Sequence, residues 1–201
     1  APTIQPIATD KPDRIQKLVD IQAKLKQGKR IGYERWAKKH NLKAMAQTLI
    51  LLQEKGLLNE DALDQRIAEL DTKFHESLAV VKDLETRMAN NQTLRRYAAS
   101  YKQYRPLAQK RNAAKSPATF EEQHRAELTA YRAAAAYFKA NNITKLPSPK
   151  KLEAEYAQLA SEKAKFYEQY KEAKEELLKL KTAKQNVASF FREEEPAQQE
   201  R

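Results

Sequence analysis

The C-terminal part of this chain carries a regular stripe of mostly apolar residues that only a long helix can place on one face. Its positions are separated by alternating steps of four and three residues, which is the spacing of a coiled-coil seam. A helix over these roughly 40 residues would span about 60 Å at ~1.5 Å per residue. Such a stripe must be covered by another helix. Its members are Leu152, Tyr156, Leu159, Lys163, Phe166, Tyr170, Ala173, Leu177, Leu180, Lys184, Val187 and Phe191.

A second stripe with the same spacing lies earlier in the chain, at Leu63, Ile67, Leu70, Phe74, Ser77, Val81, Leu84 and Met88. Because the two stripes can cover each other, we expect their helices to pack antiparallel, with a shorter helix capping one end. The phase breaks at Asn90 and Asn91, which predicts a kink or a change of seam. A displaced stripe then follows at Leu94, Tyr97, Tyr101 and Tyr104.

Capping residues predict where the N-terminal helices begin and end. Asp10 is the expected N-cap of a first helix, with Pro12 in its first turn. A second helix is expected from about residue 33 to residue 55, and Gly56 follows it where a C-terminal cap belongs. A third helix should start after Asn59, because acidic residues follow and favour a helix N-terminus.

Prolines and hydroxyl residues punctuate the second half. Pro106 predicts a helix end or a kink, and residues 109–117 are expected to form a loop or a frayed turn. Thr119 with Glu122 offers a capping box for a helix that runs to about residue 141. Ser148 and Pro149 predict the N-cap and first position of the last helix.

Composition supports a helical protein with seams rather than a large core. The chain has 201 residues, of which 32% are charged, with three glycines and no cysteine. We predict an all-α fold, an elongated antiparallel coiled-coil hairpin of long helices with shorter helices at the ends. The expected domains are an N-terminal helical pair (residues 1–58), the long hairpin (59–192) with an inserted helix (119–141), and a disordered acidic tail (193–201).

The terminus and the residue usage suggest where the chain works. It begins at Ala1 with Pro2, Pro6 and Pro12 close behind, and we expect it to be a fragment of a longer protein. The absence of cysteine excludes disulfides and fits a reducing compartment. No apolar run approaches the ~20 residues of a membrane span, so no membrane insertion is expected.

Residues 93–118 hold the strongest functional signal that the residues give by themselves. They include seven basic and no acidic side chains, with three tyrosines among them, in a chain of net charge +11. A phosphate backbone attracts such a segment. On a helix the tyrosines share one face, which favours packing, while Arg95 and Lys102 point nearly opposite. The candidate nucleic-acid-binding residues are Arg95, Arg96, Lys102, Arg105, Lys110, Arg111 and Lys115. Plain solubility is the competing interpretation of this charge.

A second basic cluster lies near the N-terminus and includes two aromatic residues, Tyr33 and Trp36. We expect Trp36 to be buried in a core; stacking on a nucleic-acid base is the less favoured alternative. The basic members are Lys24, Lys26, Lys29, Arg30, Arg35, Lys38 and Lys39.

Catalytic and metal-binding patterns are missing from the sequence. His40, His75 and His124 have no second histidine at the spacing of a metal site. There is no glycine-rich phosphate loop, and no hydroxyl has an arguable base beside it. We therefore assign no catalytic residue, no metal site and no cofactor, and we expect no enzymatic activity from this segment.

Three stretches carry a resemblance to a known family: YERWAKKHNLKAMAQTLILLQEKGL (33–57), KLPSPKKLEAEYAQLASEKAKFYEQYKEAKEEL (145–177) and LLKLKTAKQNVASFF (177–191). They resemble the C-terminal helical region of relaxases, the mobilisation nucleases of conjugative transposons and plasmids. In that family an N-terminal domain nicks DNA with a tyrosine and a His-bound metal, and neither pattern occurs here. The resemblance implies a bacterial, cytoplasmic, non-catalytic accessory segment that works on transfer DNA.

Two functional hypotheses follow from these observations. The first is a DNA-contact segment that binds the origin-of-transfer region through phosphates, without base specificity. The second is a protein–protein module, a scaffold that recruits the coupling protein or other transfer proteins, or that self-associates. Adsorption to an anionic membrane is disfavoured, because the basic helices lack a dense apolar face.

Overall fold

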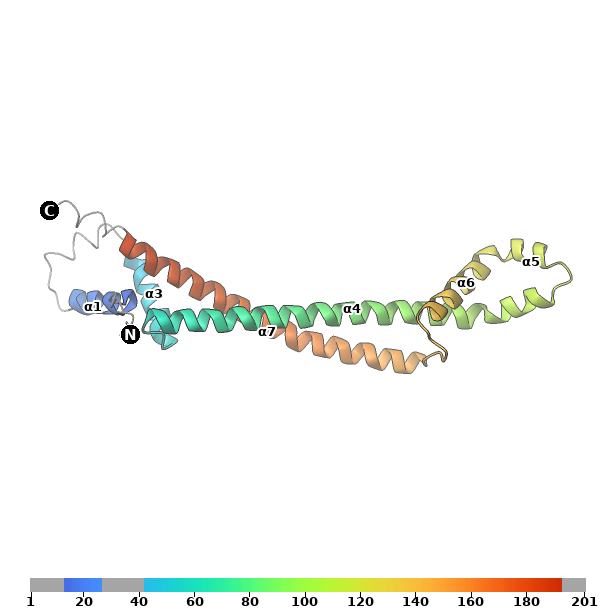
Figure 1. Cartoon of the computed structure of the whole chain (residues 1–201), viewed down its shortest axis with the longest axis horizontal. Coiled ribbons are helices and arrows are strands. Elements are labelled where there is room, and N and C mark those ends of the chain that lie inside the picture. Colours follow the sequence, from blue (N-terminus) through green and yellow to red (C-terminus); the bar gives the residue numbers. More distant parts are fainter. Residues whose placement is uncertain (1–12, 27–41, 193–201) are drawn as a thin grey trace, which may run out of the picture. The chain divides into compact units, whose positions relative to one another are not determined.

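The computed structural model describes residues 13–26 and 42–192, and every regular element in these ranges is a helix (Figure 1). The all-α prediction is therefore confirmed. None of the described helices is both long enough and apolar enough to cross a membrane. In chain order the helices are α1 (Arg14–Lys26), α3 (Leu42–Glu54), α4 (Glu60–Ala113), α5 (Pro117–Gln123), α6 (Arg125–Ala140) and α7 (Pro149–Arg192).

Contacts group the chain into two compact units, and both long helices contribute to each unit. Unit 1 comprises residues 1–75 and 170–201, and unit 2 comprises residues 76–169. The domain limits predicted from the sequence, at residues 58 and 192, stay predictions. The second basic cluster, apart from Lys24 and Lys26, and the acidic tail lie outside the described residues.

Unit 1 is held by an apolar cluster to which α1, α3, the start of α4 and the end of α7 all contribute. The α7 members follow the predicted stripe up to Leu180 and then continue through Ala183, Val187 and Phe190. Lys184, a predicted stripe position, is instead exposed, and its Nζ lies 2.5 Å from Asp64 Oδ1. The remaining buried members are Ile15, Leu18, Met45, Leu49, Leu52, Leu57, Leu63, Leu70, Ala173 and Leu177.

The N-terminus of α1 is capped by Asp13 rather than by Asp10. Asp13 Oδ1 accepts hydrogen bonds from the backbone N–H groups of Ile15 (2.9 Å) and Gln16 (3.1 Å). Its Oδ2 accepts another from the backbone N–H of Glu60 (2.6 Å), the first residue of α4. One carboxylate thus satisfies free N–H groups at the starts of two helices. Asp10 lies outside the described residues.

The turn between α3 and α4 follows the prediction. Gly56 has φ 68°, and the backbone N–H of Leu57 donates to Leu52 O at 2.8 Å, which closes a glycine C-cap. Asn59 Oδ1 accepts from the N–H of Ala62 at 2.7 Å and caps α4. The predicted second helix is described only from Leu42 onward.

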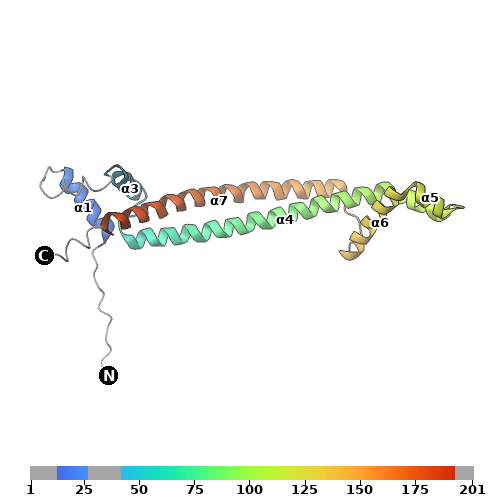
Figure 2. The same ribbon diagram turned by 90° about the horizontal axis from the view of Figure 1, so that it is seen from above.

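In unit 2 the α4 and α7 segments lie side by side and run in opposite directions (Figure 2). Glu85 pairs with Lys163 at 2.7 Å, and Arg95, ten residues further along α4, meets Glu153, ten residues earlier on α7, at 3.9 Å. Leu84 and Leu159 are among the residues buried in this unit.

The helix α4 extends further than the sequence predicts. The predicted helix end near Pro106 is wrong, because α4 continues through Pro106 to Ala113. The loop or frayed turn predicted over residues 109–117 is confined to residues 114–116. An interior proline costs roughly 3 kcal/mol. Leu107 and Ala108 are half-buried and Arg111 is bonded to Glu121, so tertiary contacts offset that cost. Asn91, at the predicted phase break, is helical and only 5% exposed.

The connection from α4 to α7 contains two helices where one was predicted. The first, α5, starts at Pro117 rather than Thr119, with Ser116 before it and proline at its first position. The predicted capping box is wrong, because Thr119 lies inside α5 and not before its first turn. A break at His124 separates α5 from α6. The start of α7 is as predicted, since Ser148 Oγ accepts from the N–H of Lys151 at 3.2 Å.

Candidate nucleic-acid interface

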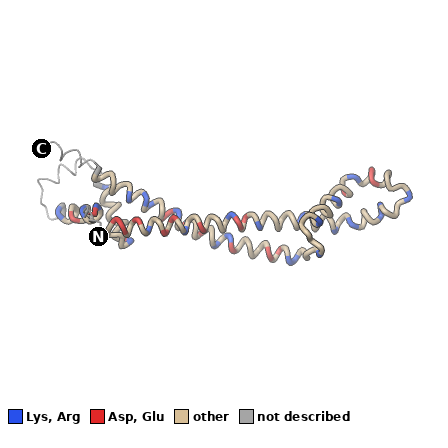
Figure 3. Tube along the Cα trace, in the orientation of Figure 1, with Lys and Arg blue, Asp and Glu red and all other residues tan. Residues whose placement is uncertain are grey.

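The seven candidate basic residues lie at the C-terminal end of α4 and just beyond it, all within unit 2. Lys and Arg follow one another there without an intervening Asp or Glu (Figure 3). Lys115 belongs to the short non-helical segment before α5. Arg95 and Arg111 are half-buried. The exposed members are Arg96, Lys102, Arg105, Lys110 and Lys115.

Three of these cations already have partners within the unit. Arg111 Nη2 donates to Glu121 Oε2 at 2.9 Å, and Arg132 donates to the other oxygen of the same carboxylate. These hydrogen bonds, from Arg132 first and Arg111 second, hold the pKa of Glu121 below its ordinary value. Arg95 lies 3.9 Å from Glu153, and Arg96 lies over the ring of Tyr97 at 5.3 Å. Of these three cations, Arg111 has the shortest contact with its partner, a hydrogen bond to Glu121.

The other four cations have no acidic partner in the described part of the chain: Lys102, Arg105, Lys110 and Lys115. The surrounding composition adds to their charge. Residues 93–151 contain thirteen Lys and Arg and only three Asp and Glu. Most of the net charge of the chain is therefore concentrated in this part of unit 2.

The tyrosine stripe of α4 packs against α6. The rings of Tyr97 and Tyr137 stack with centroids 4.5 Å apart, and those of Tyr101 and Tyr131 stack at 4.9 Å. Tyr101 also meets Phe138 edge-on at 5.4 Å. The pKa of Tyr131 is raised, mainly by a hydrogen bond with Tyr101 and to a smaller extent by burial. The prediction that these tyrosines pack is confirmed for Tyr97 and Tyr101, whose ring faces are used inside the unit.

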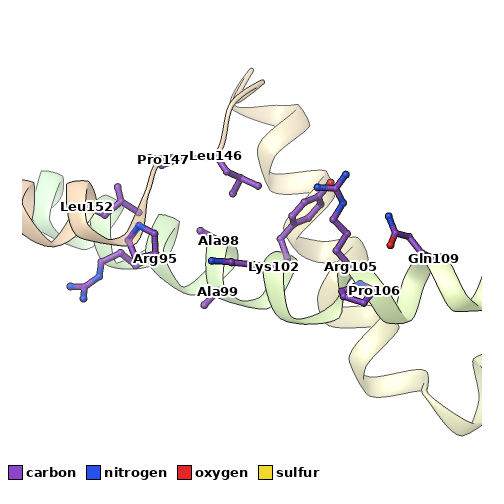
Figure 4. Close-up of a pocket in the computed structure, with 12 residues that line it drawn as sticks. Arg95, Ala98, Ala99, Lys102, Arg105, Pro106, Gln109, Leu146, Pro147 and Leu152 are labelled. Carbon is purple, nitrogen blue, oxygen red and sulfur yellow. The ribbon is translucent and has the colours of Figure 1, made fainter.

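A groove of about 520 Å³ runs along α4 beside the turn that leads into α7 (Figure 4). Arg95, Lys102 and Arg105 line it, and none of its lining residues is acidic. Leu146, which is 38% exposed, and Pro147 lie across from α4. The remaining lining residues are Ala98, Ala99, Tyr101, Pro106, Gln109, Pro149 and Leu152.

The groove continues the α4 seam beyond the end of its partner helix. From Asn91, the alternating steps of four and three lead to Arg95, Ala98, Lys102, Arg105 and Gln109, and each of these five lines the groove. The seam predicted from the sequence ends at Met88, because most of the next positions with this spacing are polar. Spacing alone, without the requirement for apolar side chains, would have extended it.

The structure thus brings together three of the seven predicted residues and leaves the others apart. At ~100° per residue, Lys102 lies about 20° around α4 from Arg95, and Arg105 about 80°. Arg96 and Arg111 are turned away by about 100° and about 160°. Arg96, Lys110, Arg111 and Lys115 do not line the groove.

The remaining candidates add no chemistry. His75 is exposed beside Phe74, and His124 packs against Phe120 with centroids 4.6 Å apart. His40 and Trp36 lie outside the described residues. Among the residues that the structure describes, no group of three or more His, Cys, Asp or Glu is placed to hold a metal ion.

Comparison with known proteins gave no relative. No family model, curated protein or solved structure matches this chain. We therefore infer the function from the residues of the chain and from where the structure places them.

Proposed function

We propose that this segment contacts DNA through its phosphates, as a non-catalytic accessory part of a relaxase in conjugative DNA transfer. The observation that carries the proposal is the concentration of positive charge over residues 93–151, which contain thirteen basic residues and three acidic ones. Lys102, Arg105, Lys110 and Lys115 have no acidic partner in the described residues, so they remain available to an external anion.

The expected binding is independent of DNA sequence. Lysine and arginine bind phosphates mainly through charge, and release of condensed counterions supplies the free energy. Base stacking is not part of the proposal, because the faces of Tyr97 and Tyr101 are stacked on α6. The link to relaxases rests on the resemblance of residues 33–57 and 145–191 to the C-terminal helical region of that family.

Fluorescence anisotropy with a 24-base-pair duplex of arbitrary sequence tests this proposal. With four phosphate contacts, the logarithm of the binding constant should fall with the logarithm of salt concentration with a slope of about −4. Duplexes of unrelated sequence should bind equally well. No binding at about 50 mM salt would overturn the proposal.

A pair of triple variants separates local charge from total charge. The test variant is Arg96→Glu, Lys110→Glu and Lys115→Glu, which lies outside the groove, and we expect it to bind duplex DNA at least tenfold more weakly. The control variant is Lys73→Glu, Lys82→Glu and Lys165→Glu, which makes the same change in net charge at exposed positions elsewhere. Equal losses in both variants would contradict a local interface.

A second candidate function, a protein–protein interaction module, is favoured by one specific observation. The seam of α4 continues past the start of α7 as an open groove, which alanines, leucines and prolines line together with three cations. A seam with this spacing is a surface that pairs with helices.

A further inference from the structure

We propose that the groove along α4 is a docking site for an acidic amphipathic helix of a partner protein. The proposal gives the second candidate function a site and a kind of partner. It does not depend on DNA binding. It is carried by the α4 seam that continues beyond the start of α7, by the small residues that line the groove and by the sign of its charges.

The seam shows that the groove has the geometry of a helix-pairing surface. At the last paired level, Asn91 Nδ2 donates to Leu152 O at 3.1 Å, and Arg95 faces Glu153. The helix α7 begins at Pro149, while α4 continues to Ala113. From Arg95 to Gln109 the open seam covers fourteen steps, about 21 Å at ~1.5 Å per residue. An occupant helix of two heptads matches this length.

The floor of the groove admits a helix at close range. Ala98 and Ala99 lie on α4 between Arg95 and Lys102, where their small side chains leave room for another backbone. Leu146, Pro147 and Leu152 form an apolar wall. A short helix with Leu or Ala along one face would pack between α4 and this wall at the usual interaxial distance of about 8–10 Å.

The positive charges of the groove favour a negatively charged partner helix. Arg95, Lys102 and Arg105 occupy seam positions, and no acidic residue lines the groove. Arg95 already lies 3.9 Å from Glu153, but Lys102 and Arg105 have no acidic partner among the described residues. An apolar helix laid over Lys102 and Arg105 would cover these cations without compensation, which is unfavourable. A helix with Asp or Glu beside its apolar stripe would pair with these cations while covering the alanines. Complementary charge would also reject basic helices.

The acidic residues at the end of this sequence do not suit this role. Its acidic residues 193–201 read EEEPAQQER and contain no large apolar side chain, so they cannot supply an apolar stripe. Unstacked bases of a single-stranded nucleic acid also fit the groove poorly. Tyr101, its aromatic lining residue, is stacked on Tyr131 and packed against Phe138, which leaves no free ring for a base.

A designed peptide pair tests the proposal with the full chain. The probe is a labelled 21-residue helical peptide with Leu and Ala on one face and Glu at the flanking positions. The control peptide has the same apolar face with Lys in place of every Glu. We expect the acidic peptide to bind at least tenfold more tightly in fluorescence anisotropy. In NMR titrations, amide shifts should concentrate at residues 95–109 and 146–152.

Matched variants then locate the site. Lys102→Glu in the groove and Arg96→Glu outside it make the same charge change at exposed positions of α4. We expect at least a tenfold loss of peptide binding for the first and less than a threefold loss for the second. Ala98→Trp, which fills the groove without changing charge, should also weaken binding at least tenfold. Far-UV circular dichroism verifies that each variant is folded.

Several outcomes would overturn the proposal. They include equal binding of the acidic and basic peptides, equal losses for Lys102→Glu and Arg96→Glu, and full binding by Ala98→Trp. Self-association that Ala98→Trp abolishes would assign the groove to a second copy of the chain. Competition by single-stranded DNA with shifts at the groove would assign it to nucleic acid. The triple variant at Arg96, Lys110 and Lys115 should retain peptide binding, which keeps this test separate from the DNA proposal.

Discussion

Asn91 of α4 donates a side-chain hydrogen bond to the carbonyl oxygen of Leu152, in the first turn of α7, at 3.1 Å. The same Nδ2 atom also lies 3.3 Å from Glu155 Oε2. Asn91 is only 5% exposed, and no described atom donates to its buried Oδ1. A polar residue at a seam position fixes the register of a helix pair at a cost in stability. In unit 2 this contact lies at the level where α7 begins and the groove opens.

Replacing Asn91 with leucine should therefore stabilise the protein while loosening its register. The variant removes a buried oxygen without a partner and adds apolar contact, so we expect a gain of about 1 kcal/mol in unfolding free energy. Urea unfolding followed by circular dichroism measures the gain. Asn90→Leu, at the exposed neighbouring position, is the control and should change stability by less than about 0.5 kcal/mol. A destabilised Asn91→Leu protein would contradict this reasoning.

Lowering the pH should destabilise unit 1, because the carboxylate of Glu176 becomes protonated. Its carboxylate accepts a hydrogen bond from Arg66 Nη2 at 3.0 Å and lies 3.3 Å from Lys55 Nζ. Burial alone would raise the pKa of Glu176, but the hydrogen bonds from Arg66 and Lys55 outweigh burial and hold the pKa below its ordinary value. A lowered pKa in the folded state means that the stabilisation is fully present above the unfolded-state pKa. It is lost as pH falls through the folded-state value.

The variant Glu176→Gln tests this linkage. Because Arg66 is partly exposed, solvent screening limits the expected loss at pH 7 to about 0.5–1 kcal/mol. The difference between variant and parent should shrink as pH falls below about 4, since the parent carboxylate is then protonated. Unfolding free energies measured from pH 7 to pH 3 check this. A difference that is constant with pH would exclude an electrostatic role for Glu176.

Some of this fold could be predicted from sequence because local signals agreed with packing. Gly56 and Ser148 act where their chemistry requires, at a left-handed cap and at an N-cap. The stripe from Leu152 to Leu180 is largely buried, as its spacing predicts. These predictions depended on short-range rules that tertiary contacts reinforce.

Other features needed information that local patterns do not carry. Pro106 locally favours a helix end, yet contacts of the following turns keep α4 helical. The helix break at His124 cannot be predicted from the local sequence, because no glycine or proline lies beside it. The sequence does not indicate the groove, because its seam positions hold Arg95, Lys102 and Arg105 and not a stripe of apolar side chains. Only the relative lengths of α4 and α7 show that this stretch of seam lacks a partner within unit 2.

Replacing Gly56 with alanine should destabilise the turn between α3 and α4. Gly56 adopts φ 68°, a left-handed conformation that costs alanine about 1 kcal/mol. A Cβ atom added there would meet no atom within 4 Å, so the expected loss is purely conformational. Gly56→Asn should lose less, because asparagine tolerates this conformation better. Thermal unfolding of the two variants checks the order, and an alanine variant as stable as the parent would contradict it.

Replacing Pro106 with alanine should strengthen the end of α4. Proline at this position cannot donate to the carbonyl of Lys102, and its ring crowds the preceding turn. Because Pro106 is exposed, the alanine variant loses little packing, and we expect a gain of about 1–3 kcal/mol. Slower amide hydrogen exchange over residues 102–113 should accompany the gain. Pro117→Ala is the matched control, since proline at the first position of α5 leaves no hydrogen bond unmade, and its effect should stay below about 0.5 kcal/mol. If Pro106→Ala instead destabilised the protein, the backbone around the proline would be held in a shape that the contacts of Leu107 and Arg111 require.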